Sequence, residues 1–250
     1  MSDLLVLCYH AVSDDWPAVL SSEPQRLRSQ LKLLVARGFD GATFTDAVTN
    51  PRPGRTVVVT FDDAYRSVLE RAKPVLDDLE LPGTVFVPTL YPGRDQIMAW
   101  PGIDEWVGTR FEGELSPLGW DDLAELANQG WEVGSHTRTH PRLSSLDDAE
   151  LERELVDSRA ECEAALGIRC RSLAYPYGDH DARVVAATRR AGYEAAATLP
   201  AQLHRGSPHR WPRIGVYRGD DMRRFKLKVS PTVRRLRGTR AWRWLRQKHP

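Results

Sequence analysis

Short apolar runs alternate with amphipathic stretches about seven times along this chain, without an internal sequence repeat. The clearest run lies in Thr56–Asp63, where no polar side chain interrupts residues 57–59, a pattern typical of a strand buried on both faces. A helical pattern follows over residues 64–79, in which Pro74 predicts a kink. The alternation predicts an α/β fold, either a (β/α) barrel or a doubly wound sheet.

The other expected elements follow the same reasoning. The patterns predict further strands at residues 4–7, 39–44, 84–89, 131–134, 172–175, 193–199 and 214–217, and helices at residues 24–37, 116–129, 147–166 and 181–191. Thr45 is a plausible helix N-cap. Residues 91–115 are rich in glycine and aromatic residues, which predicts a long loop that shapes a binding cleft.

The formal net charge of +1 conceals an asymmetry. Residues 223–250 hold eleven Lys and Arg and no acidic residue, so residues 1–222 carry 24 basic against 34 acidic side chains, a net charge of −10. A chain of 250 residues with 41% hydrophobic residues is long enough for one large α/β domain. We therefore expect a single domain over residues 1–222 and a basic, aromatic-containing tail over residues 223–250.

Cysteine use and the N-terminus bear on the compartment. The three cysteines, Cys8, Cys162 and Cys170, are an odd number without C-x-x-C spacing, which argues against a disulfide scaffold and suits a reducing compartment. The apolar run at residues 4–9 is too short for a signal peptide or a membrane span, and no basic segment precedes it. We therefore expect a cytoplasmic protein.

Two groups of polar residues indicate chemistry. Asp62 and Asp63 end the segment that contains the buried run, at the strand end where active sites of α/β folds collect, although one of them could merely cap the next helix. His136 and His140 are four residues apart and can meet one metal if the segment is helical or tightly turned. Two imidazoles and one carboxylate leave a divalent metal open to water, and the second carboxylate remains free as a base.

These residues stand in three segments that resemble the motifs of the polysaccharide deacetylases, carbohydrate esterase family 4. The segments are Thr60–Asp63, Gly134–Pro141 and Ala174–Gly178, and their order and spacing match as well. The resemblance, which also extends to chitooligosaccharide deacetylases, implies a distorted (β/α)7-type barrel. It further implies the removal of N- or O-acetyl groups from sugars with a divalent metal, most readily zinc, with nickel, cobalt or manganese as alternatives.

The resemblance also implies roles for individual residues. Asp62 would be the general base, and Asp63, His136 and His140 would bind the metal. The backbone N–H of Tyr177 would stabilise the oxyanion of the tetrahedral intermediate.

The chain departs from the common family pattern in the position of its acid. Many members carry a catalytic His near the C-terminus, where this chain offers only His204, His209 and His249, none at a clear strand end. His10 does follow an apolar strand, an arrangement similar to the permuted deacetylases that act on poly-N-acetylglucosamine. We therefore expect His10 to be the acid, although a lone His after a strand is often only packed or capping.

Two further motif positions differ. The third family motif usually begins with an Arg that orients the catalytic Asp, and here the position is Ala174. Arg213, before the last expected strand, is the candidate replacement. The fourth motif, which supports the base and lines the acetyl pocket, is absent, and Leu199 or Trp211 could line that pocket.

These observations predict a metal-dependent deacetylase of an acetylated sugar or glycan. The alternatives are an amidohydrolase of the same fold that acts on a non-sugar amide, and an inactive glycan-binding module. A shallow open cleft would favour a glycan and a closed pocket a small amide. The tail could be solvated or bind an anionic membrane surface, which a sugar-active body makes a better partner than nucleic acid.

Overall fold

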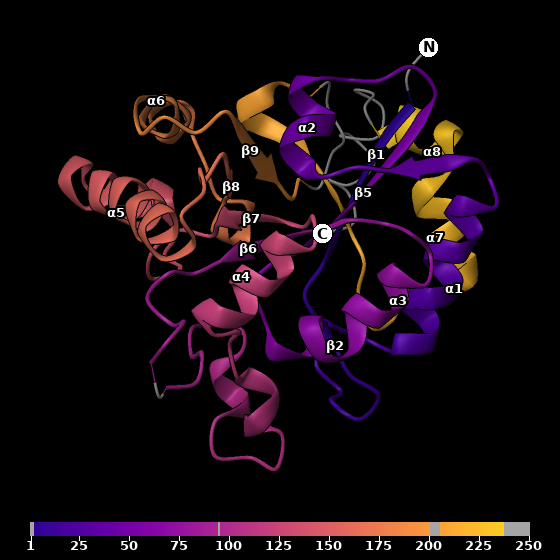
Figure 1. Ribbon diagram of the computed structural model, residues 1–250, viewed down its shortest axis with the longest axis horizontal. Helices are drawn as coiled ribbons and strands as arrows, with labels where there is room; N and C mark the ends of the chain where they lie inside the picture. Colours follow the sequence, from indigo (N-terminus) through magenta and orange to yellow (C-terminus); the bar gives the residue numbers. More distant parts are fainter. Residues whose placement is uncertain (1–2, 95, 201–205, 238–250) are drawn as a thin grey trace, which may run out of the picture.

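The core of the fold is a sheet of parallel strands that curls into a nearly closed barrel (Figure 1). The structure, a computed structural model of the chain, describes residues 3–94, 96–200 and 206–237. The nine strands run in the order β10-β9-β8-β7-β6-β5-β1-β11, and β4 pairs with the first half of β5. Their bounds are β1 Asp3–Tyr9, β4 Phe39–Gly41, β5 Arg55–Phe61, β6 Gly83–Val87, β7 Glu132–Ser135, β8 Ser172–Ala174, β9 Ala195–Thr198, β10 Trp211–Pro212 and β11 Ile214–Gly215. A separate two-stranded sheet joins β2 (Ala11–Val12) and β3 (Ser21–Ser22).

One short stretch of chain closes the barrel. Trp211 and Pro212 pair with β9, whereas Ile214 and Gly215 pair with β1 at the opposite end of the strand order. Arg213 stands between these two pairings, and its backbone N–H donates to the Thr198 carbonyl at 3.1 Å. The barrel expected from the resemblance, rather than a doubly wound sheet, is therefore confirmed.

Alternate residues of the strands point to two separate cores. On β5, Val57 and Val59 belong to the large cluster formed with the surrounding helices, whereas Val58 belongs to a smaller one. The smaller cluster takes residues from β1, β5, β6, β8 and β9, which places it inside the barrel, and α2 (Phe44–Thr49) contributes Phe44 to it. The interior is therefore packed, and only the ends of the strands are available for a site.

Helices cover the outside of the barrel (Figure 1). Their bounds are α1 Pro24–Val35, α3 Lys73–Asp77, α4 Trp120–Asn128, α5 Asp148–Leu166, α6 Ala182–Arg190, α7 Met222–Val229 and α8 Pro231–Arg237. A π-helical turn, Val68–Ala72, leads into α3 just before Pro74, which has no N–H for a regular helical bond. The predicted irregularity at this proline is confirmed. None of the helices in the described residues is both long enough and apolar enough to span a bilayer.

Two local expectations are wrong. Thr43, not Thr45, is the N-cap of α2, because Thr45 is buried and donates its backbone N–H and its hydroxyl to the Glu132 carboxylate. The helix expected over residues 116–129 begins only at Trp120, since the preceding residues extend the loop and form an isolated bridge between Pro117 and Tyr65.

The chain after residue 222 also differs from the expected tail. Helix α7 packs near α1 and buries Phe225 and Val229, so these residues belong to the packed body. In α8, Arg234 pairs with the Asp3 carboxylate at 2.8 Å and donates to the Leu4 carbonyl at 3.0 Å. The packed body therefore continues beyond the boundary expected at residues 222 and 223. The remaining tail, residues 238–250 with His249, lies outside the described residues.

Candidate active site

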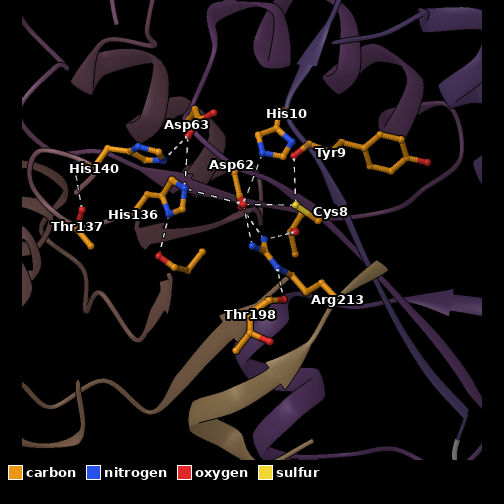
Figure 2. Close-up of polar contacts among 12 residues, drawn as sticks. Cys8, Tyr9, His10, Asp62, Asp63, His136, Thr137, His140, Thr198 and Arg213 are labelled. Atoms are coloured by element: carbon orange, nitrogen blue, oxygen red, sulfur yellow. Dashed lines mark hydrogen bonds and ion pairs between the residues drawn. The ribbon is translucent and has the colours of Figure 1, made fainter. Parts of the chain in front are cut away.

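The candidate residues converge where neighbouring parallel strands end (Figure 2). His10 follows β1, Asp62 and Asp63 follow β5, and His136 follows β7. Backbone bonds hold two of these residues beside the next strand: Asp62 N–H donates to the Tyr9 carbonyl at 3.0 Å, and His136 N–H donates to Val87 at 2.8 Å. The sheet ladder thus continues one residue past each strand and fixes the direction of the side chain.

Asp63, His136 and His140 form a compact buried cluster. The Nε2 atoms of both imidazoles lie 3.4 Å from Oδ1 of Asp63, and the three ligand atoms all lie within 4.8 Å of one another. A separation near 3.4 Å is close to the edge of a tetrahedron of ligands at about 2.1 Å from a central ion. The cluster could therefore hold one divalent metal.

A tight turn, not a helix, brings His140 to His136. Thr137 and His140 both have positive φ, 66° and 64°, which non-glycine residues rarely adopt. Side chains hold the turn: the Thr137 N–H donates to the Ser135 hydroxyl, and the His140 N–H donates to the Thr137 hydroxyl. Glu154 on α5 accepts from the backbone N–H groups of residues 138 and 139, at 2.8 and 2.9 Å.

The donor atoms of the cluster suit a cation. Oδ1 of Asp63 is buried and has no hydrogen-bond donor among the described residues. His136 Nδ1 donates to the Ala174 carbonyl at 2.8 Å, which leaves the lone pair of Nε2 pointing toward Asp63. Burial, and the charge of Asp62 beside it, raise the pKa of Asp63 well above its ordinary value. A positive ion would supply the countercharge that this carboxylate lacks.

Asp62 is held separately by Arg213. The guanidinium donates to both carboxylate oxygens, at 2.6 Å to Oδ1 and 2.7 Å to Oδ2, and also to the Thr60 hydroxyl. Burial alone would raise the pKa of Asp62, but the Arg213 charge and the nearby imidazoles lower it more, so the net pKa is well below its ordinary value. Arg213 also lies over the ring of Phe86, a residue of the interior cluster.

His10 lies on the other side of Asp62. Its Nε2 is 4.0 Å from Asp62 Oδ2, and burial lowers the pKa of His10 to about 4. The thiol of Cys8, two residues earlier on the same strand, approaches the same oxygen at 3.4 Å, and burial raises the pKa of Cys8 well above its ordinary value. Sequence reasoning assigned Cys8 no role here, although a two-residue spacing on a strand already places it on the His10 side.

The other candidate residues lie in different places. Tyr177 and Leu199 line the cleft above the cluster, whereas Trp211 packs against the interior cluster and is not among the cleft-lining residues. His209 does not line the cleft either, and its ring contacts the Tyr193 carbonyl at 2.9 Å. His204 lies outside the described residues.

The cleft has a volume of about 550 Å³ and reaches solvent at a rim that includes the exposed Tyr177. The loop expected to shape it does so through Trp100, whose ring stacks on His140 with centroids 4.2 Å apart. Gly178 has a φ of 68°, and a Cβ there would lie 3.0 Å from the Leu199 backbone.

Three residues that line the cleft were not evident from the sequence: Trp100, Arg142 and Tyr217. Nothing in a loop sequence shows which side chains turn inward.

Comparison with known proteins shows to which family the chain is related. The family model described as polysaccharide deacetylase matches residues 49–196. YxkH of Bacillus subtilis (strain 168), named as a provisional polysaccharide deacetylase, is 23% identical over 200 residues, which are 78% of this chain and 64% of YxkH. The chain thus spans less than two thirds of that relative.

Solved structures share the fold. The deacetylase PplD of Streptococcus pyogenes, solved in complex with acetate, has a TM-score of 0.73 and 21% identity, with 91% of this chain and 98% of PplD covered. IcaB of Ammonifex degensii has a TM-score of 0.68 and 26% identity, with 86% of this chain and 91% of IcaB covered. The matched family model, the barrel and the acidic and imidazole residues at its strand ends agree: this chain belongs to the polysaccharide deacetylase family.

Proposed function

We propose that the protein is a metal-dependent hydrolase that removes acetyl groups, first of all N-acetyl groups, from a sugar or glycan. One observation carries this proposal: a carboxylate held ionised by Arg213 stands directly beside a separate three-residue cluster suited to a metal, at the floor of an open cleft. The cluster residues are imidazoles and a carboxylate, which suit zinc and also nickel, cobalt or manganese.

Each residue then has a distinct task. When bound, the metal supplies Lewis-acid polarisation of the acetyl carbonyl and a water molecule of lowered pKa. Asp62, kept ionised by Arg213, accepts the proton of the attacking water. The backbone N–H of Tyr177 donates to the developing oxyanion.

The leaving amine needs a proton, and His10 is the proposed donor. Burial lowers the pKa of His10 to about 4, so the imidazole is neutral near pH 7 and must gain the proton that it delivers. Asp62 Oδ2, 4.0 Å away, is the adjacent source. In this scheme the water proton passes from Asp62 to His10 and then to the amine as the C–N bond breaks.

Two competing functions make different predictions. A non-sugar amide would suit a closed pocket, but the cleft opens to solvent at Tyr177 and at Val19, whose exposed fraction is 70%. An inactive glycan-binding module would need neither a metal cluster nor a separate paired carboxylate. An O-acetyl sugar ester would be attacked by the same groups and remains part of the proposal.

The proposed function is tested by acetate release from a panel of N- and O-acetylated sugars and N-acetylated amino acids, after reconstitution with each of the four metals. We expect release from acetamidosugars, and we expect Asp62→Asn to abolish release while the metal content stays near one per chain. Release from the amino acids alone would favour the amidohydrolase. No release from any substrate by metal-loaded protein would refute the proposal.

A further inference from the structure

Arg142 brings a positive charge to the rim of the cleft. It is exposed, follows the turn that carries His140, and lines the cleft together with Tyr177. Among the described residues that line the cleft, the other ionisable groups apart from tyrosine hydroxyls are the two carboxylates and three imidazoles of the site, all of them buried at its floor. A substrate whose acetyl group reaches the floor therefore passes beside this guanidinium.

Arg142 covers an aromatic ring that could otherwise stack on a sugar. Its guanidinium carbon lies 4.3 Å from the centroid of the Tyr177 ring. The ring makes two further contacts: its hydroxyl donates to the Pro101 carbonyl at 3.2 Å, and it meets the His140 ring edge to face with centroids 4.7 Å apart. This contact uses the charge of the guanidinium and none of its N–H donors, so the donors remain available to a ligand.

No acidic side chain of the described residues neutralises Arg142, since none has a carboxylate oxygen within 4.0 Å of it. Two nearby carboxylates are engaged elsewhere. Asp104 accepts from the Gly102 N–H at 3.2 Å, and Asp179 accepts from the Ser144 N–H and hydroxyl at 2.8 and 2.9 Å. By contrast, Arg183 beside the same turn pairs with Asp148 at 2.8 Å.

We propose that Arg142 selects acetylated sugars that carry an anionic substituent, a carboxylate or a phosphate, close to the acetamido group. This inference rests on the proposed deacetylase function and names its substrate class. A planar guanidinium can bind either anion with two parallel hydrogen bonds, which a neutral hydroxyl cannot match. The contact with the Tyr177 ring keeps the guanidinium beside the cleft before the substrate arrives.

The test compares three soluble substrates with metal-loaded protein. They are di-N-acetylchitobiose as the neutral substrate, N-acetylmuramic acid for the carboxylate, and N-acetylglucosamine 6-phosphate for the phosphate. The readout is the ratio of kcat/KM for each anionic substrate to that for the neutral one. We expect the wild-type ratio for at least one anion to exceed one and to fall as salt rises, because the attraction is screened.

Substitutions at Arg142 should change that ratio. We expect Arg142→Gln to lower the ratio about tenfold and Arg142→Glu to lower it further. Arg142→Lys should keep part of the preference, since an ammonium retains the charge but not the paired N–H donors. Arg153→Gln, at an exposed position on α5 outside the cleft-lining residues, is the matched control and should leave the ratio unchanged. A ratio that Arg142→Gln does not change, or that Arg153→Gln changes equally, would overturn the inference.

A binding measurement separates this inference from the proposed function. Titration calorimetry of the three sugars with Asp62→Asn, and with Asp62→Asn combined with Arg142→Gln, measures anion preference without turnover. If the wild type releases no acetate from any sugar, the proposed function fails, and the calorimetric preference still decides the role of Arg142. If acetate is released but neither measurement favours an anion, only the role of Arg142 fails.

Discussion

Replacing Arg213 with Met tests how the buried base is held. The substitution keeps a long apolar stem but removes both hydrogen bonds to Asp62, which are 2.6 and 2.7 Å long. The side chain of Arg213 is fully buried and that of Asp62 is 4% exposed, so water cannot replace the lost donor. The variant therefore leaves an unpaired carboxylate in the protein interior.

The expected cost follows from that burial. Removing one partner of a buried ion pair typically costs about 3–5 kcal/mol. In a chain of this size, 1 kcal/mol lowers Tm by about 2–4 °C, so Tm should fall by roughly 6–20 °C. The matched control is Arg28→Met, which breaks an exposed pair with Asp78 and should cost less than about 1 kcal/mol.

The pH dependence of the loss gives a second check. In the wild type, the pKa of Asp62 is lower in the folded state than in the unfolded state, where it is about 4. The ion pair therefore contributes its full stability above about pH 4, and this contribution is lost as the pH falls through the pKa of the folded state. Without Arg213, burial still raises the pKa of Asp62 and only the neighbouring imidazoles oppose it, so the carboxylate gains less from being ionised. The stability difference between wild type and Arg213→Met should therefore shrink as pH falls.

Thermal and denaturant unfolding measure these differences. Acetate release measures the effect on turnover, which should fall at least about tenfold because the base loses the charge that favours its ionised form. The double variant Asp62→Asn with Arg213→Met removes both charges and should recover much of the lost stability. A loss no larger than that of Arg28→Met, without recovery in the double variant, would refute the account of Arg213.

Three further predictions concern the acid, the metal and the tail. His10→Ala should lower kcat about a hundredfold at unchanged metal content, measured by acetate release, and near wild-type release would show that another group is the acid. Metal analysis should show loss of the ion in Asp63→Ala and His140→Ala but about one ion per chain in Asp62→Asn, and retention in all three would contradict the proposed ligands. Deleting residues 238–250, which add four basic residues and Trp242 and Trp244, should lower binding to anionic vesicles in a salt-dependent way while leaving hydrolysis of a soluble acetamidosugar unchanged. Full-length protein that ignores such vesicles at low salt would contradict the predicted role of the tail.

The sequence predicted most of the parallel strands and the chemical groups at their ends, and the family resemblance implied the barrel. Asp62 and Asp63 follow an apolar run whose burial is evident from its composition, so their place at a strand end needed no tertiary information. The spacing of His136 and His140 predicted a shared metal, conditional on a tight turn, and the structure contains that turn. Local chain geometry fixes such relations, because a side chain one residue past a strand has little freedom.

The partners of these groups were less evident. Arg213 was a candidate from its position before the last strand, but its paired bonds to Asp62 join residues 151 apart in the chain. Cys8 approaches the same carboxylate across 54 residues. The packing of α7 was missed because its charges suggested a tail, whereas Phe225 and Val229 supply its buried face.

These contacts form only because the strands close into a barrel. The stretch from Trp211 to Gly215 pairs with β9 on one side and β1 on the other, and this register turns Arg213 toward Asp62. No local pattern encodes that register, since it depends on how the whole ring of strands closes. Residue type and spacing determine which groups can take part in the chemistry. The long-range pairing of strands determines which distant side chains form hydrogen bonds or contacts with those groups.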